Sequence, residues 1–146
     1  MLKPRNGTGF ASDGKINALS DRWGVELSFA KKRQELYPNE KLAILKYART
    51  GSSIVSGGTA YFGAWEPDFK GGKEINQYGY FLKTVNNAIN VQDISGDGVE
   101  NVLIPSGIIL MQGESDSDKS EQIANQYYSN LKRLMEQILA TFRNND

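Results

Sequence analysis

Histidine and cysteine are both missing from the 146 residues of the chain. Without histidine, neither a Ser–His–Asp nor a Cys–His catalytic arrangement can be assembled from this chain alone, and two-histidine metalloprotease chemistry is excluded as well. Without cysteine, there is no disulfide, no thiolate nucleophile and no zinc–sulfur site. Proton transfer by this chain would therefore fall to carboxylate, lysine or tyrosine side chains.

An excess of charge is also missing, because 17 acidic residues balance 17 basic ones. No net charge favours nucleic acid or an anionic membrane, and we expect neither as a partner. No apolar run reaches the length of a membrane span, and the first ten residues lack the hydrophobic region of a signal peptide, so the sequence leaves the cellular location open. A hydrophobic content of 39% over 146 residues is ordinary for one globular domain.

Local patterns predict an alternation of helices and strands. Residues 1–22, rich in Gly, Ser, Asn and Asp, predict an irregular lead-in, and residues 23–146 form a single domain. Apolar residues at helical spacing predict helices near 24–37 and 74–91. Two compact apolar runs, 41–48 and 106–112, predict buried parallel strands.

The last helix is the most strongly patterned segment. Ser115, Asp116 and Asp118 supply capping signals for its start. Between the first strand and the second helix, residues 49–72 contain six glycines and predict a long loop, which in a compact domain is usually functional. The apolar face of the last helix is expected to comprise Ile123, Tyr127, Leu131, Leu134, Ile138 and Phe142.

This order of elements predicts an α/β fold, a parallel sheet flanked by helices. In such sheets the ligand crevice lies beyond the carboxyl ends of the strands. The segments that leave the two predicted strand ends are residues 49–52 and 112–115. The fold therefore places a candidate site at these two loops.

The loop after the second strand, QGESD at residues 112–116, resembles the signature of the sialate O-acetylesterase and acetylxylan-esterase branch of the SGNH hydrolases. Two further blocks agree in order. GVELSFA at residues 24–30 resembles the family's G-x-E-x-x-F-A helix start, and KYARTGS at residues 46–52 resembles its K-x-A-x-G-G-T/S strand end. Trp65 stands where a tryptophan often follows. The resemblance covers roughly residues 23–142 and implies a flavodoxin-like, three-layer α/β/α sandwich that removes acetyl groups from sugars without a cofactor or metal.

The resemblance also implies roles for individual residues. Gln112 and Gly51 would form the oxyanion hole, the first through its side-chain amide and the second through its backbone amide. Glu114 would be a buried hydrogen-bonding support for the loops, together with Ser115 and Asp116. The substrate, an acetylated carbohydrate, would contact Ser52 and Trp65.

The departures from the family pattern are equally informative. The upstream G-Q-S-N block, which carries the nucleophilic serine, and the downstream D-x-x-H block, which carries the base, do not occur, and Thr50 replaces the first glycine of the usual pair. We expect an incomplete SGNH domain: a fragment of a longer gene, a degenerate paralogue or half of a split enzyme. The isolated chain should be inactive, and a homo-oligomer should cover the missing strand.

Other interpretations of the same residues stay open. Gly51 alone could be an ordinary turn glycine. Glu114 and Asp116 could be a paired-carboxylate glycosidase site, although two carboxylates at a helix start are more often capping groups. Asp93 begins a segment that partly resembles a calcium loop, but Ile104 stands where the twelfth-position carboxylate belongs. A catalytically dead glycan-binding or structural module of the same fold is the main alternative function.

Overall fold

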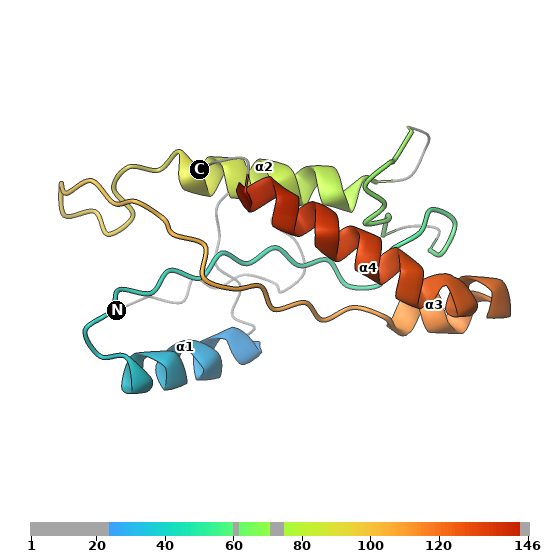
Figure 1. The fold of residues 1–146 in the computed structure, drawn as a ribbon, viewed down its shortest axis with the longest axis horizontal. Coiled ribbons are helices and arrows are strands. Elements are labelled where there is room, and N and C mark those ends of the chain that lie inside the picture. Colours follow the sequence, from blue (N-terminus) through green and yellow to red (C-terminus); the bar gives the residue numbers. More distant parts are fainter. Residues whose placement is uncertain (1–23, 60–61, 71–74, 144–146) are drawn as a thin grey trace, which may run out of the picture. The chain divides into compact units, whose positions relative to one another are not determined.

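A computed structural model describes residues 24–59, 62–70 and 75–143 (Figure 1). The predicted lead-in at residues 1–22 lies outside these ranges. The chain divides into two compact units, Met1–Ile44 and Leu45–Asp146, so the boundary falls inside the first predicted strand.

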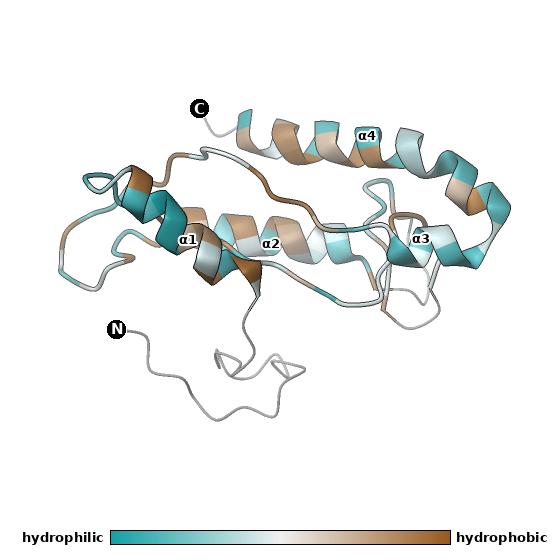
Figure 2. Ribbon diagram, turned by 90° about the horizontal axis from the view of Figure 1, so that it is seen from below, coloured by the Kyte–Doolittle hydropathy of each residue, from teal (hydrophilic) through white to brown (hydrophobic). Residues whose placement is uncertain are grey.

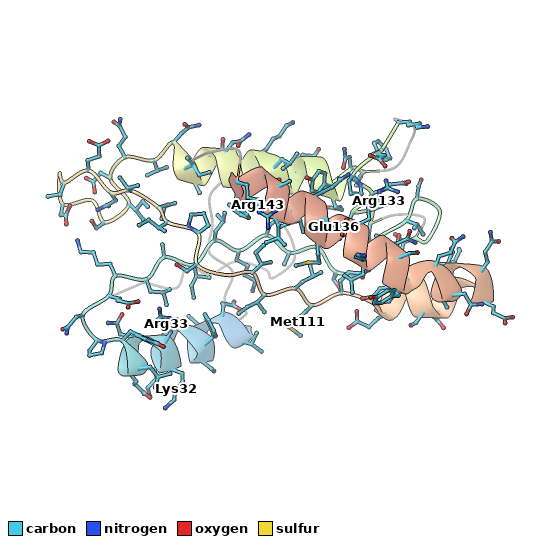
Figure 3. The ribbon with its side chains drawn as sticks, in the orientation of Figure 1. Lys32, Arg33, Met111, Arg133, Glu136 and Arg143 are labelled. Atoms are coloured by element: carbon cyan, nitrogen blue, oxygen red, sulfur yellow. The ribbon has the colours of Figure 1, made fainter. Side chains whose placement is uncertain are left out.

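The described part of the first unit consists of helix α1 (Val25–Leu36) and the residues that follow it. This confirms the helix predicted near 24–37. Arg33 fixes its C-terminal end (Figure 3): the guanidinium lies 3.5 Å from the centre of the Tyr37 ring, and Nη2 lies 2.7 Å from Glu40 Oε2. Apolar residues of the helix remain exposed, with Val25 at 59% and Leu36 at 61%.

Helix α2 (Gln77–Ile89) opens the helical part of the second unit and confirms the helix predicted near 74–91. Asn76 caps it, because its side-chain oxygen accepts a hydrogen bond from the Gly79 amide at 2.9 Å. Val85 faces the interior and is completely buried.

The predicted last helix is two helices, α3 (Glu114–Lys119) and α4 (Glu121–Arg143). Ser120 separates them with an extended backbone and caps α4, its Oγ accepting from the Ile123 amide at 3.2 Å. The predicted capping role of Ser115, Asp116 and Asp118 was therefore wrong, since all three lie inside α3.

The core of the second unit forms where α2 and α4 meet the segment between residues 52 and 65. Its fully or nearly buried side chains are Ile54, Trp65, Leu134 and Ile138. Leu134 and Ile138 belong to the predicted apolar face of the last helix, and Figure 2 shows hydrophobic positions recurring along α4 among hydrophilic ones. Two side-chain contacts add to this packing: Tyr78 of α2 donates to the Gln137 carbonyl of α4 at 3.3 Å, and Arg133 pairs with Asp68.

The predicted parallel sheet is not confirmed by the described residues. They contain only two single parallel bridges, Ser53 to Ala64 and Ala64 to Asn76. The segments 41–48 and 106–112 run extended (Figure 1) but belong to no strand. A strand is stabilised through the backbone groups of a neighbouring strand, and neither segment has such a neighbour among the described residues. None of the described helices combines the length and hydropathy needed to cross a bilayer.

Candidate functional site

A buried carboxylate joins the two loops that the sequence singles out. Asp116, on α3, is 1% exposed. Its two oxygens accept hydrogen bonds from the Ile54 amide at 3.0 and 2.9 Å, and Oδ1 also lies 3.5 Å from the Val55 amide. Residues 62 positions apart are thereby held together, so the loop after the first predicted strand lies directly against the QGESD segment.

Gln112 contacts the same carboxylate, that of Asp116. Its Nε2 donates to Asp116 Oδ2, and its backbone carbonyl accepts from the Tyr127 hydroxyl at 2.6 Å. Burial raises the pKa of Tyr127, and the charges of Asp116 and Glu114 raise it further, so this hydroxyl keeps its proton and remains a donor at neutral pH. The side chain and the main chain of Gln112 are thus each held by one partner.

Gly113 makes this close approach sterically acceptable. Its φ of 151° lies outside the range that other residues adopt readily, and a Cβ placed there would lie 3.0 Å from the Tyr127 hydroxyl oxygen. The positive φ therefore favours glycine between Gln112 and α3, and a Cβ there would also need the Tyr127 hydroxyl to shift by a few tenths of an ångström.

Gly51 has a positive φ of 67°. An ordinary turn glycine would have the same conformation. A Cβ at this position would come within 2.6 Å of the Phe62 ring. Its amide donates to no other residue in the described part of the chain. An N–H without an acceptor among the described residues is what an oxyanion donor at this loop needs.

Ser52 and Trp65, expected to contact the substrate, instead lie in the core. Trp65 is 7% exposed, and its indole N–H donates to Ser52 Oγ at 3.0 Å. Ser52 Oγ donates in turn to the Arg49 carbonyl at 2.9 Å. Tyr47 packs edge-on against the indole at 5.4 Å between ring centres. These residues shape the loop from within and offer no free polar group to a sugar.

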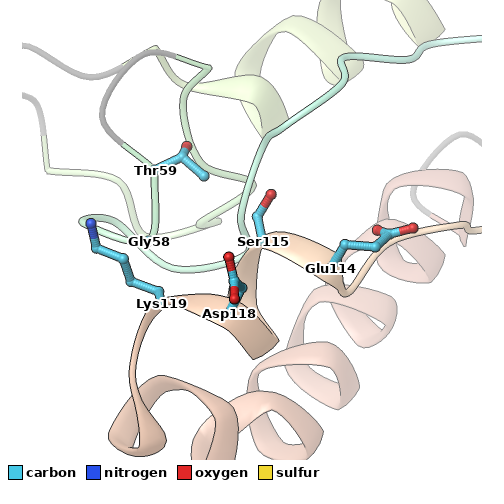
Figure 4. Close-up of a pocket in the computed structure, with 6 residues that line it drawn as sticks. All are labelled: Gly58, Thr59, Glu114, Ser115, Asp118 and Lys119. Carbon is cyan, nitrogen blue, oxygen red and sulfur yellow. The ribbon is translucent and has the colours of Figure 1, made fainter.

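Of the two carboxylates expected to support the loops, only Asp116 is buried. The sequence predicts a buried Glu114, but its side chain is exposed and points away from Thr59 and Ser115 (Figure 4), whereas Asp116 is the buried support. The reason is geometric: residues two apart on a helix face different directions, and only Asp116 faces the Ile54 amide.

Beside these residues lies a shallow, open depression of about 320 Å³ (Figure 4). Ser115 lies within it and makes no side-chain hydrogen bond to the other described residues. The depression mixes hydroxyl, carboxylate and ammonium groups, the kind of lining that hydroxyl-rich ligands contact. It is lined by Gly58, Thr59, Glu114, Ser115, Asp118 and Lys119.

The Asp93 loop is closed by its own backbone. Asp93 accepts from the amides of Gly96, Asp97 and Gly98 at 2.6, 3.2 and 2.8 Å. The Gly98 amide, followed by those of Gly96 and Asp97, holds the pKa of Asp93 below its usual value. Asn101 closes the other side by accepting from the Ile94 amide at 2.9 Å. The Asp93 oxygens serve a turn, and the described residues contain no group of three or more potential metal ligands.

Sequence reasoning missed two members of this arrangement, Ile54 and Tyr127. Neither residue type indicates a site, since one contributes only its amide and the other lies on an apolar helix face. Both are found only through their contacts with the QGESD segment.

Comparison with known families agrees with the sequence signature. The model of the SASA family, described as "Carbohydrate esterase, sialic acid-specific acetylesterase", matches residues 11–146. No curated protein and no solved structure matches the chain significantly.

Proposed function

The chain belongs to the carbohydrate esterase family of sialic acid-specific acetylesterases, and on this premise we propose that its two joined loops form the oxyanion-binding part of a carbohydrate O-acetylesterase. The observation that carries the proposal is the buried Asp116, which holds the QGESD segment against the loop that contains Gly51. Two segments distant in sequence, each matching a family block, are thereby brought to one place.

The proposed chemistry is hydrolysis of an acetyl ester through a tetrahedral intermediate. Negative charge then develops on the former carbonyl oxygen and is stabilised by fixed N–H donors about 2.7–3.1 Å away. We assign these donors to the Gly51 amide and the Gln112 side-chain amide. Asp116 takes one Nε2 hydrogen of Gln112, and the second remains for the oxyanion.

The acetylated sugar is proposed to lie in the depression beside α3. Ser115 and Lys119 can donate to sugar oxygens there, and Asp118 can accept from sugar hydroxyls. Neither Gln112 nor Gly51 lines the depression, which reaches the QGESD segment through Glu114 and Ser115. We propose that a sugar bound there extends its acetyl group toward Gln112, at the start of the same segment.

The nucleophile and the base are not assigned to this sequence. It contains neither a G-Q-S-N nor a D-x-x-H block and no histidine. We therefore propose that residues 1–146 alone do not catalyse serine-dependent ester hydrolysis. The alternative, a catalytically dead glycan-binding or structural module, is supported by the same absence and would use the same depression.

The experiment is to join segments carrying the two missing blocks to this chain and to measure turnover of an O-acetylated sugar. Replacing Gln112 with alanine should lower kcat by roughly 10²–10³-fold, the usual effect of removing one oxyanion donor. Gln122, exposed on α4, provides the matched control, and Gln122→Ala should leave kcat unchanged. Equal turnover in Gln112→Ala and Gln122→Ala would refute the assignment.

A further inference from the structure

Three N–H groups converge on the carboxylate of Asp116. Two come from the backbone at Ile54 and Val55, and the third is the side-chain amide of Gln112. The carboxylate acts toward all three only as an acceptor. Its burial leaves it no alternative interaction with solvent.

We propose that Asp116 is a positioning residue that sets which end of the Gln112 amide faces the acyl site. The inference rests on the proposed role of Gln112 as an oxyanion donor. A glutamine amide has a donor end and an acceptor end of nearly the same shape, and only the donor end can stabilise an oxyanion. Some neighbour must therefore choose between the two orientations.

Asp116 makes this choice by electrostatics. Turning the amide over would place Gln112 Oε1 against a carboxylate oxygen, two acceptors without a proton between them. The observed orientation instead directs Nε2 to Asp116 and leaves its second hydrogen available.

The other end of the amide shows how firmly this orientation is imposed. Gln112 Oε1 is buried and has no hydrogen-bond partner among the described residues. A buried polar atom without a partner is unfavourable. The contact of Nε2 with Asp116 thus holds the amide in this orientation although Oε1 gains no partner from it.

Asp116 also sets the distance between the two proposed donors. Ile54 lies three residues beyond Gly51, and its amide is fixed on the same carboxylate that holds Gln112. The Tyr127 hydroxyl fixes the main chain of Gln112 at 2.6 Å, which leaves its side-chain amide as the part that Asp116 controls. One carboxylate thus controls the orientation of one donor and the position of the loop that carries the other.

The test uses the chain of residues 1–146 and nuclear magnetic resonance of its amide groups. In the unchanged protein, a Gln112 Hε2 proton should show a nuclear Overhauser contact with the Ile54 amide proton, because both donate to one carboxylate. Asp116→Asn can present a donor to Gln112, so this contact should be lost and the two Hε2 resonances should shift. Asp118→Asn, an exposed neighbour on the same helix, should change neither.

The possible results distinguish a positioning role of Asp116 from a merely structural one. Unaltered Gln112 Hε2 signals in a folded Asp116→Asn variant would overturn the proposal. Absence of the nuclear Overhauser contact in the unchanged protein would also overturn it, and this second measurement does not depend on the folding of a variant. A merely structural Asp116 would shift the Ile54 amide in the variant and leave the Gln112 Hε2 protons in place. Because no step requires turnover, failure here is distinct from a restored enzyme that is indifferent to Gln112→Ala.

Discussion

Replacing Asp116 with alanine should destabilise the second unit far more than the same change at Asp118. The substitution leaves the Ile54 amide, on a residue only 2% exposed, without an acceptor and removes the partner of Gln112 Nε2. Hydrogen bonds to a charged group contribute about 1.5–3 kcal/mol each. The Val55 contact at 3.5 Å is too long to add much.

The expected loss is about 2–4 kcal/mol, because Gln112 is only partly buried and can recover some hydrogen bonding with water. Asp118→Ala is the matched control. Both aspartates lie on α3, so both substitutions bring the same small gain in helix propensity, and an exposed change away from other contacts should alter stability by no more than about 0.5 kcal/mol.

Urea unfolding followed by circular dichroism measures the difference directly, since the linear dependence of the unfolding free energy on urea gives a midpoint and a slope for each variant. If Asp116→Ala and Asp118→Ala unfold within about 0.5 kcal/mol of each other, the buried contact is not what joins the loops.

Three further outcomes are expected. The isolated chain should not hydrolyse p-nitrophenyl acetate in a serine-dependent way, and stoichiometric labelling of one serine by a fluorophosphonate with matching turnover would refute this. The chain should self-associate, because Val102, Ile104 and Met111 are 81%, 79% and 77% exposed (Figure 3 labels Met111); a sharply melting monomer, unchanged on dilution in light scattering, would contradict it. The Asp93 loop should bind no calcium at micromolar concentrations, which calorimetry tests. Folding lowers the pKa of Asp93, so its carboxylate stabilises the loop at pH values above its usual pKa of 3.8. This stabilisation should be lost as the pH falls through the lowered pKa of the folded protein. The amide resonances of Gly96 and Gly98 would report the loss.

The helices were predictable because each is specified by neighbours three and four residues apart. The apolar spacing predicted for the last helix included Leu134 and Ile138, which the structure shows buried in α4. Sequence could not predict the break at Ser120. It separates α4 from α3, where Asp116 contacts Ile54, 62 residues away, and local capping rules contain no information about such a contact.

The predicted sheet, unlike the helices, could not be inferred from neighbouring residues alone. Apolar runs such as residues 106–112 predict a strand only on the condition that a neighbouring strand is present to pair with it, and the described residues supply none. The sequence motif located the candidate site at QGESD, but it gave the support role to Glu114 as well as Asp116, and only Asp116 is buried. A motif fixes the order of residues, whereas the orientation of each side chain depends on where α3 begins.

Gly51 and Gln112 are proposed to donate to one oxyanion. A crystal structure of the restored esterase with a tetrahedral phosphonate adduct tests this proposal most directly. One phosphonate oxygen should lie about 2.7–3.1 Å from both the Gly51 amide nitrogen and Gln112 Nε2, with Asp116 still accepting from Gln112. An adduct whose oxygen is bound elsewhere, with Gly51 and Gln112 at opposite ends of the domain, would contradict the account.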